Sequence, residues 1–166
     1  MIYQYFIFNP IRRGVHLHID SMKLRRILVP IDGSDYSDRA LDLAIQMGEK
    51  FEADIEIINV VIYPIVTFSP LPVRLETEYY EQLKDISKKM LNQAHNKALQ
   101  SVPNLKISSK SLIGKPGKKI LERADEGNFD IIIMGSRGLG GMEELLLGSV
   151  SQVVAHGAKV PVTLVK

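Results

Sequence analysis

Short apolar runs alternate with helical patterns along the chain from Lys23 to its end. Three runs, "RRILVPID" (Arg25–Asp32), "FDIIIMG" (Phe129–Gly135) and the closing "VPVTLVK", are almost continuously apolar and predict buried strands. The segment "ADIEIINVVIY" alternates and then becomes apolar, which predicts another strand with a buried end. The segment "LKISSKSLIG" (Leu105–Gly114) is more polar, so we expect a strand at an edge of the sheet. The last strand is also predicted at an edge.

The first two segments between these strands have apolar residues at helical spacing. Ser34 or Asp35 is a candidate N-cap for the first of these helices. Its predicted apolar face consists of Ala40, Ala44, Met47 and Phe51. A long helix is predicted over Arg74–Gln100, after a proline-rich loop at 64–72. Its apolar positions are Leu75, Tyr79, Leu83, Ile86, Met90, Ala94 and Ala98.

Two further helices are predicted nearer the end of the chain. Pro116 suits the first turn of a helix that Gly127 closes. Ser149 with Gln152 forms a capping-box pattern, which predicts the start of the last helix. The apolar face of that helix is predicted to be Val150, Val153 and Val154.

The order of these elements predicts the fold class. Alternating strands and helices indicate an α/β protein with a doubly wound, five-stranded parallel sheet and helices on both faces. Ligands of such folds bind at the carboxyl ends of the strands, where the strand order reverses. "PIDGSD" follows the first strand and "GSRGLGG" follows the fourth. If those strands are neighbours, both loops face one crevice.

Length and composition narrow the class of protein. The 166 residues indicate one compact domain, predicted over 22–166; residues 1–21 are predicted to be an N-terminal extension, either disordered or an artefact of the start site. A formal net charge of +2 favours neither nucleic acid nor a membrane surface as a partner. The absence of cysteine excludes disulfides and thiolate sites, and agrees with a cytoplasmic location.

Glycine is concentrated in "GSRGLGGMEELLLGS" (Gly135–Ser149), which holds five of the chain's twelve glycines. A glycine-rich loop between a strand and a helix is suited to phosphate, because backbone N–H groups and the helix N-terminus face the anion. The cluster is not a Walker A motif, since the segment "GKPGKKI" has Lys119 where that motif needs glycine. It is not a Rossmann fingerprint either, because Glu143 stands where a glycine is required.

The cluster instead follows the spacing G-x2-G-x9-G-[ST], with Gly135, Gly138, Gly148 and Ser149. With this motif, the opening "RILVPIDGSDYSDRAL" and the closing "VPVTLVK", the chain resembles the universal stress protein family over Lys23–Lys166. The resemblance implies strand order 3-2-1-4-5, in an adenine nucleotide alpha hydrolase-like fold. It also implies ATP binding, because family members that keep this glycine pattern typically bind ATP.

The resemblance carries a set of cofactor-binding residues onto this chain. On the adenosine side it places Pro30, Asp32 and Val60, with Ser34 beside them. On the ribose and phosphate side it places Met134, Gly135, Arg137, Gly138, Gly148, Ser149, Val150 and Ser151. The cofactor is expected to be ATP or another adenine nucleotide, with Mg²⁺ bound through the phosphates and no metal ligand assigned to the protein.

Three of these residues keep a second interpretation. Asp32, an acceptor when ionised, suits an amino group or a sugar hydroxyl, but it can also cap the first helix or finish a turn. Ser149 can donate to a phosphate or only cap the last helix. Arg137 can pair with a phosphate or be a solvated side chain.

No catalytic residue is assigned. No serine–histidine–acid arrangement is visible from the spacing, and His95 and His156 are expected on the surface. Asp32, Asp35 and Glu143 are candidate acids that nothing in the sequence brings together.

Three hypotheses of function follow. The first is an ATP-binding stress-response sensor or switch with no or very slow hydrolysis, in which ATP orders the 136–147 loop. The second is a nucleotide-independent dimeric interaction module, because the terminal strand commonly builds a homodimer in the family, here residues 160–165. The third is a slow ATPase that requires a partner. The downstream protein partner is unknown.

Overall fold

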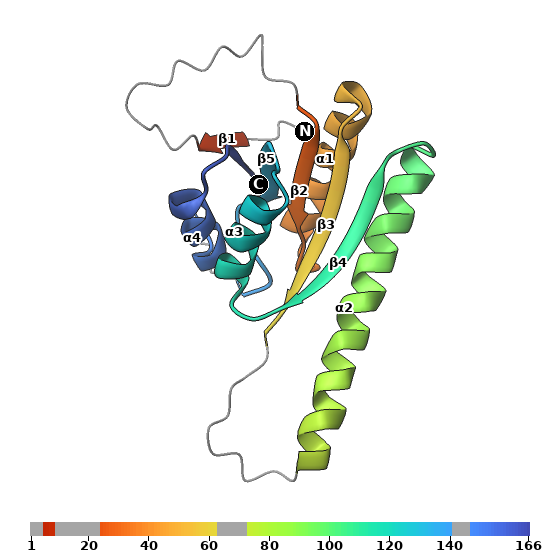
Figure 1. Cartoon of the computed structure of the whole chain (residues 1–166), viewed down its shortest axis with the longest axis vertical. Helices are drawn as coiled ribbons and strands as arrows, with labels where there is room; N and C mark the ends of the chain where they lie inside the picture. The colour runs from red at the N-terminus through yellow and green to blue at the C-terminus, as the bar shows by residue number, and fades with distance from the viewer. Residues whose placement is uncertain (1–4, 9–23, 63–72, 141–146) are drawn as a thin grey trace.

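The computed structural model describes residues 5–8, 24–62, 73–140 and 147–166 of the chain. A twisted sheet runs through the middle of the molecule and helices pack on both of its faces (Figure 1). The proline-rich segment 64–72 lies outside the described residues, and so do Glu143 and Glu144 of the glycine loop.

Six strands form this sheet in the order β1-β6-β5-β2-β3-β4. The strands are β1 (Tyr5–Phe8), β2 (Arg26–Pro30), β3 (Asp54–Val61), β4 (Ile107–Ile113), β5 (Ile131–Gly135) and β6 (Val162–Val165). Strands β2 to β6 run parallel to one another. Numbered on their own along the chain, these five strands have the order 3-2-1-4-5. The predicted fold class and strand order are confirmed.

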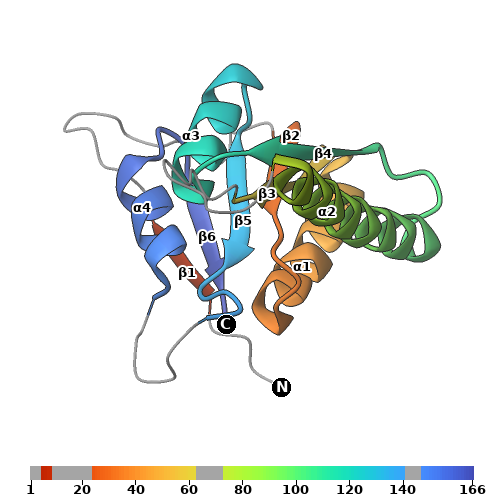
Figure 2. The ribbon, with the colours of Figure 1, turned by 90° about the horizontal axis from the view of Figure 1, so that it is seen from below.

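Two helices cover each face of the sheet. Figure 2 shows α3 and α4 on one side, with α1 and α2 on the other. The helices are α1 (Asp35–Phe51), α2 (Val73–Ser101), α3 (Pro116–Glu126) and α4 (Ser149–Gly157). Successive residues of a strand point to opposite faces, so Ile27 and Val29 of β2 enter the core beside α1 while Leu28 enters the core beside α3 and α4. Both faces are apolar, which explains the continuous apolar runs of the sequence.

Helix α1 begins where the sequence predicted. Ser34 is its N-cap, and the Ser34 hydroxyl oxygen accepts a hydrogen bond from the Ser37 backbone N–H at 3.2 Å. The predicted apolar face is partly wrong. Ala40 and Ala44 are buried, but Phe51, the last residue of the helix, is 49% exposed. The rest of the buried face is Ser37, Leu41, Ile45 and Gly48.

Helix α2 is longer than the sheet that it covers. Its N-terminal half extends past the strands in Figure 1, while its C-terminal half packs on them. Tyr79, predicted in its apolar face, is 51% exposed in the N-terminal half. Ile86, also predicted there, is 56% exposed because the neighbouring Ser87, and not Ile86, faces β4. Leu91, Ala94 and Ala98 are buried. None of the helices within the described ranges combines the length and the apolarity that a membrane span requires.

The prediction that the last strand forms an edge of the sheet is wrong. β1 lies antiparallel along the outer side of β6, in a register from Tyr5 opposite Val165 to Phe8 opposite Val162. The sequence pattern predicted no strand within residues 1–21. All four residues of β6 are buried, so this strand has the environment of a central strand. The predicted edge at β4 is confirmed, since β4 ends the sheet on the other side.

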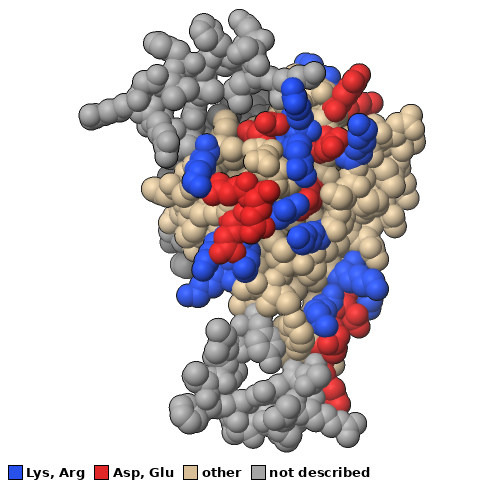
Figure 3. Space-filling model, in the orientation of Figure 1, with Lys and Arg blue, Asp and Glu red and all other residues tan. Residues whose placement is uncertain are grey.

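The surface carries both signs of charge side by side. On the face seen in Figure 3, acidic and basic side chains are interspersed rather than gathered into fields of one sign. Several form ion pairs, such as Lys119 with Glu122 at 2.7 Å and Lys159 with Asp125 at 2.5 Å. The described residues of this face therefore form no basic stripe of the kind that recognises phosphate backbones.

Candidate functional site

A cavity of about 500 Å³ opens at the carboxyl ends of β2, β3 and β5. One wall comes from the β2–α1 loop and the opposite wall from the β5–α4 loop, which holds the glycine cluster. β2 and β5 are hydrogen-bonded neighbours, and the chain leaves them toward opposite faces of the sheet. The cavity thus lies where the strand order reverses, which is the usual ligand position in folds of this kind.

Most of the residues that the sequence assigned to binding line this cavity. They are Pro30, Asp32, Val60, Met134, Gly135, Arg137, Gly138, Gly148, Ser149, Val150 and Ser151. Ser34 does not: it is buried as the N-cap of α1 and lines a smaller cavity of about 280 Å³ behind the β2–α1 loop. The other lining residues were not predicted from the sequence; they are Ile31, Ser37, Ile58, Asn59, Ile62, Pro116, Ile120, Leu139, Gly140 and Leu147.

Asp32 joins the two loops. One of its carboxylate oxygens accepts from the Ser34 N–H at 3.0 Å and from the Ser34 hydroxyl at 2.6 Å, which fixes the turn into α1. The other oxygen accepts from the Leu139 backbone N–H at 3.2 Å, across the cavity mouth. The interpretation of Asp32 as a residue that finishes a turn is therefore correct for one oxygen, while the second oxygen faces the glycine loop.

The glycine loop is closed at its base by one backbone hydrogen bond. The Gly148 N–H donates to the Ser136 carbonyl oxygen at 2.8 Å. Gly135 packs so closely on α1 that a Cβ atom would lie 2.8 Å from Tyr36 Cβ and 2.9 Å from the Tyr36 carbonyl carbon. A Cβ on Gly138 would collide with the Asp32 carboxylate. These two glycines thus have a packing role of their own, apart from any ligand.

The start of α4 differs from the predicted capping box. Gly148 is the N-cap and makes no side-chain capping bond, while Ser149 is the first helical residue and is exposed at the cavity. The interpretation of Ser149 as a cap is therefore wrong. The first N–H groups of a helix have no partner within the helix, and here they lie beside the cavity. Ser151, one turn later, donates its hydroxyl to the Gly135 carbonyl oxygen at 2.9 Å and holds α4 on β5.

Arg137 is the cation among the described lining residues, and Asp32 is the anion. The Arg137 guanidinium lies 5.9 Å from the centre of the Tyr36 ring, with Nη1 at 3.4 Å from the Tyr36 hydroxyl oxygen. Its Nε is buried and has no hydrogen-bond partner among the described residues. The interpretation of Arg137 as a freely solvated side chain is therefore wrong. Because the Arg137 Nε–H has no partner among the described residues, the guanidinium can still donate a hydrogen bond beside the cavity.

The inner wall of the cavity is apolar. It is formed by side chains from five elements and the β5–α4 loop, including Pro30, Ile58, Val60, Ile120, Met134, Leu147 and Val150. Asn59 is the polar exception: it is 9% exposed and its amide Nδ2 donates to the Ile31 carbonyl oxygen at 2.8 Å. The sequence signal was present, since this asparagine interrupts an apolar strand. An apolar wall with few polar groups suits an aromatic ring.

Asp35, His95 and His156 lie away from this cavity. Asp35 lines the smaller cavity. His95 is half-buried, with Nδ1 at 3.2 Å from the Ser109 hydroxyl oxygen, and His156 is exposed, with Nδ1 at 2.8 Å from the Gln152 carbonyl oxygen. Glu143 lies outside the described residues. Across the ranges that the structure describes, histidines and acids form no group of three or more that could hold a metal ion.

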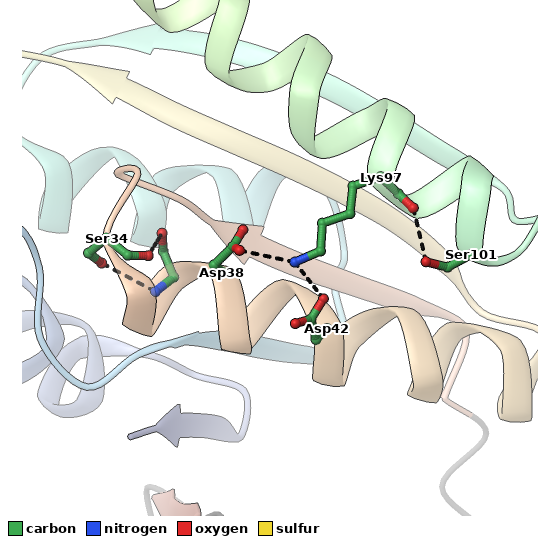
Figure 4. A network of polar contacts seen from close by, with 6 residues as sticks. Ser34, Asp38, Asp42, Lys97 and Ser101 are labelled. Atoms are coloured by element: carbon green, nitrogen blue, oxygen red, sulfur yellow. Dashed lines mark hydrogen bonds and ion pairs between the residues drawn. The ribbon is translucent and has the colours of Figure 1, made fainter.

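Behind the β2–α1 loop, a polar network ties α1 to α2 (Figure 4). Lys97 of α2 lies 3.1 Å from Asp38 and 2.7 Å from Asp42 of α1, measured between its ammonium nitrogen and a carboxylate oxygen of each. Partial burial lowers the pKa of Lys97, but its hydrogen bonds to Asp42 and Asp38 outweigh that effect and raise the pKa overall. The network fixes α2 against the helix that carries Ser34.

The sequence comparisons point to one family. A family model described as the universal stress protein family matches residues 23–166. Universal stress protein MJ0531 of Methanocaldococcus jannaschii is 34% identical over 165 residues, which cover 98% of this chain and 91% of that protein. Universal stress protein YxiE of Bacillus subtilis is 33% identical over 147 residues, which cover 85% of this chain and 98% of that protein.

The structural comparisons agree on the fold. Universal stress protein UspA from Lactobacillus plantarum superposes with a TM-score of 0.73 at 22% identity, over 86% of this chain and 98% of that one. A universal stress protein solved in complex with cAMP gives a TM-score of 0.59 at 27% identity, over 86% and 96% of the two chains. One from Archaeoglobus fulgidus, solved in complex with dAMP, gives 0.60 at 20% identity, over 87% and 100%.

Proposed function

The chain belongs to the universal stress protein family, and from that membership we propose that it binds an adenine nucleotide in the cavity between the β2–α1 loop and the glycine loop. One observation carries the proposal: a cavity of about 500 Å³ at the reversal of strand order has an apolar inner wall and an uncapped helix N-terminus. Its volume falls within the usual range of about 300–1,000 Å³ for ligand sites.

The cavity offers different chemistry to the two ends of a nucleotide. The apolar wall around Val60 and Met134 suits the adenine ring, with Asn59 as the polar group beside it. Asp32, an acceptor, suits a ribose hydroxyl or the adenine amino group. The phosphates face the backbone N–H groups after Gly148 and the hydroxyl of Ser149, where the helix dipole favours negative charge.

The charge of the cavity bears on how phosphates are held. Arg137 and Asp32 offset each other among the described lining residues, so side chains supply little net positive charge. Neighbours of this chain were solved with cAMP and with dAMP, which each carry one phosphate. For ATP, the nucleotide that the glycine motif favours, Mg²⁺ bound through the phosphates supplies the missing positive charge.

Calorimetric titration of the purified full chain tests this proposal. We expect saturable binding of ATP in the presence of Mg²⁺, with weaker binding when Mg²⁺ is removed. Titrations with AMP, cAMP and GTP then measure the contributions of phosphate number and of the base. Folded protein that gives no heat with any adenine nucleotide would overturn the proposal and favour the nucleotide-independent module.

A matched pair of arginines locates the bound phosphate. Arg137 and Arg39 both place their guanidinium over the Tyr36 ring, at 5.9 Å and 5.6 Å from its centre, but only Arg137 lines the cavity. We expect Arg137→Ala to weaken ATP binding about tenfold, on the scale of one charge-assisted hydrogen bond. Arg39→Ala should leave the affinity unchanged; equal losses in both variants would mean that the arginines act through Tyr36 and not on the ligand.

The biochemical role that we propose is that of an ATP-dependent sensor or switch in the cytoplasm, with no or very slow hydrolysis. Nucleotide bound at Asp32 competes with the Leu139 N–H for the same carboxylate oxygen, which couples ligand to loop position. Measurement of phosphate release over hours, with and without cell extract, separates the sensor from the partner-dependent ATPase. Sustained turnover by the purified chain alone would replace the sensor with an enzyme.

A further inference from the structure

The outer side of β6 is the place where this chain departs from the predicted five-stranded sheet. β1 covers β6 along its whole length, with each of the four residues of β6 opposite a residue of β1. The two strands come from opposite ends of the chain and run antiparallel. The pairing therefore closes a sheet edge that the rest of the fold leaves open.

An open edge at β6 would be a strong site for another strand. Val162 and Leu164 are fully buried on one face, and Val165 is 1% exposed on the other. With both faces covered, the unpaired N–H and C=O groups of the outer edge are what β6 can offer to a partner. The register with β1 shows that this edge accepts an antiparallel strand.

A second copy of the same strand meets this requirement. Two identical edges related by a two-fold axis run antiparallel, and such a contact is self-complementary. The chain thus has two strands of suitable direction for one position, its own β1 and the β6 of another copy. They exclude each other, because a strand edge pairs with one neighbour.

We propose that β1 is an intramolecular competitor for the outer edge of β6, and that it decides whether two copies of the chain associate through this edge. With β1 in place, the outer edge of β6 is covered and the chain is monomeric. With β1 displaced, β6 pairs with the β6 strand of a second copy. The homodimer predicted through residues 160–165 then forms on release of β1. This inference is independent of the nucleotide cavity.

The tether gives β1 its advantage. β1 is joined to β2 through residues 9–25, so its pairing with β6 is an intramolecular event. Effective concentrations for tethered segments are on the order of millimolar. At micromolar protein, β1 therefore holds roughly a thousandfold advantage over a second copy with equal contacts. Because β1 has only four residues, its pairing with β6 is weak. A higher protein concentration can therefore displace β1 from the edge.

The comparisons separate relatives in a way that agrees with this role. The match to the Methanocaldococcus protein covers 98% of this chain, so it includes β1. The match to the Bacillus protein covers nearly all of that protein but only 85% of this chain. The family model begins at residue 23, so β1 lies outside the domain that the family shares.

The first test uses the absence of cysteine from the chain. Ile7 and Thr163 lie directly opposite in the register, so Ile7→Cys with Thr163→Cys places two thiols on one face of the ladder. Opposite Cβ atoms in an antiparallel pair are about 4.5–5.5 Å apart, close to disulfide range. Phe6→Cys with Thr163→Cys is the matched control, because residues one position out of register point to opposite faces.

We expect the in-register pair to form an intramolecular disulfide at micromolar protein, seen as an oxidised monomer on a non-reducing gel. The control pair should stay reduced. Cross-linked dimers from the in-register pair would mean that β1 pairs with another copy, and no cross-link would mean that β1 does not occupy the edge. Either result overturns the proposal.

The second test compares the oxidised and reduced forms of the same in-register variant. Light scattering is measured as the protein concentration is raised from micromolar toward millimolar. The reduced form should become dimeric, and the oxidised form, with β1 locked in place, should remain monomeric. Dimers in both forms, or in neither, would overturn the proposed competition. Both forms have the same sequence, so a folding defect of the variant would affect them equally.

A third variant releases β1 at low concentration. Phe6→Pro with Ile7→Pro removes two adjacent N–H groups, one of which faces β6. Its control, Ile11→Pro with Arg12→Pro, places the same prolines outside the strand. We expect dimers of the first variant at micromolar protein, with concentration-dependent protection of the 162–165 amides, and monomers of the second. A first variant that is folded and monomeric would overturn the proposal.

Discussion

The two loops that enclose the cavity are built on opposite principles. The β2–α1 loop is short, and side chains hold it: Ser34 caps α1, and Asp32 accepts two bonds from Ser34. The β5–α4 loop is long. Backbone closes its base, through the Gly148 N–H on the Ser136 carbonyl oxygen, and its Leu139 N–H donates to the Asp32 carboxylate. A nucleotide is thus offered side-chain chemistry on one wall and main-chain N–H groups on the other. Substitutions should act differently on the two walls.

The largest effect is expected where the glycine loop touches α1. In Gly135→Val the new side chain meets the Tyr36 backbone at 2.9 Å and the Arg137 carbonyl oxygen at 3.0 Å, neither of which can move alone. We expect a loss of about 3 kcal/mol in the free energy of unfolding. Urea denaturation measures it.

Gly140→Val is the control for this comparison, because a Cβ at Gly140 has no atom within 4 Å and the residue lines the cavity. Its stability should stay within about 0.5 kcal/mol of the parent, while its ATP affinity falls. If Gly135→Val is as stable as Gly140→Val, the close packing of the loop on α1 is not what requires glycine.

The next largest effect is expected at Asp32, which accepts hydrogen bonds from both loops, from Ser34 and from Leu139. Asp32→Ala should lower ATP affinity about tenfold or more and also destabilise the fold by about 1 kcal/mol, since the turn into α1 loses its acceptor. Asp32→Asn keeps one acceptor oxygen, so it should recover most of the stability and less of the affinity. Calorimetry and urea denaturation of both variants separate the roles. An Asp32→Ala protein with normal ATP affinity would mean that Asp32 acts only in the turn into α1.

A smaller effect is expected at Ser149. A hydroxyl that caps a helix is worth about 1 kcal/mol of stability, but Gly148 is the cap here. Ser149→Ala should therefore leave the unfolding midpoint unchanged and weaken ATP binding a few-fold. A drop in stability of the size of a lost cap, with affinity intact, would restore the capping interpretation.

The smallest effect lies behind the loops, at Lys97. The raised pKa of Lys97 means that its ion pairs stabilise the fold below the ordinary value of 10.5 and lose that contribution as the pH rises through the higher folded value. The Lys97 side chain is 36% exposed, so we expect Lys97→Met to cost only about 0.5 kcal/mol at pH 7. The difference from the parent should decrease only as the pH rises above 10.5; Lys88→Met, also on α2 and exposed, is the control.

The sequence predicted what depends on local pattern. The continuous apolar runs of β2 and β5 require two covered faces, so the parallel sheet followed from them, and the glycine spacing identified the loop at its reversal point. Ser34 and Pro116 began their helices as expected, because a cap acts within one turn. The predicted cavity-lining residues on β2 and β5 came from the resemblance to the universal stress protein family.

What the sequence did not predict depends on contacts far along the chain. "YFIF" has the composition of a strand, but its partner β6 lies at the other end of the sequence, so no periodicity could reveal the pairing. Tyr79 and Ile86 fit the helical period of α2, yet both are exposed; at the turn of Ile86 it is the next residue, Ser87, that faces β4 and is buried. Asn59 interrupts an apolar strand, which marks it as unusual, but its partner, the Ile31 carbonyl oxygen after β2, is 28 residues away in the sequence.

The pairing of β1 with β6 also brings the two ends of the folded chain together. Tyr5 lies opposite Val165, so the first and last strands finish as neighbours rather than at opposite poles (Figure 1). A short peptide joining these ends would close the backbone into a ring without crossing the sheet, and new ends could then be opened elsewhere. A tag fused to either end, by contrast, arrives at the same corner of the molecule.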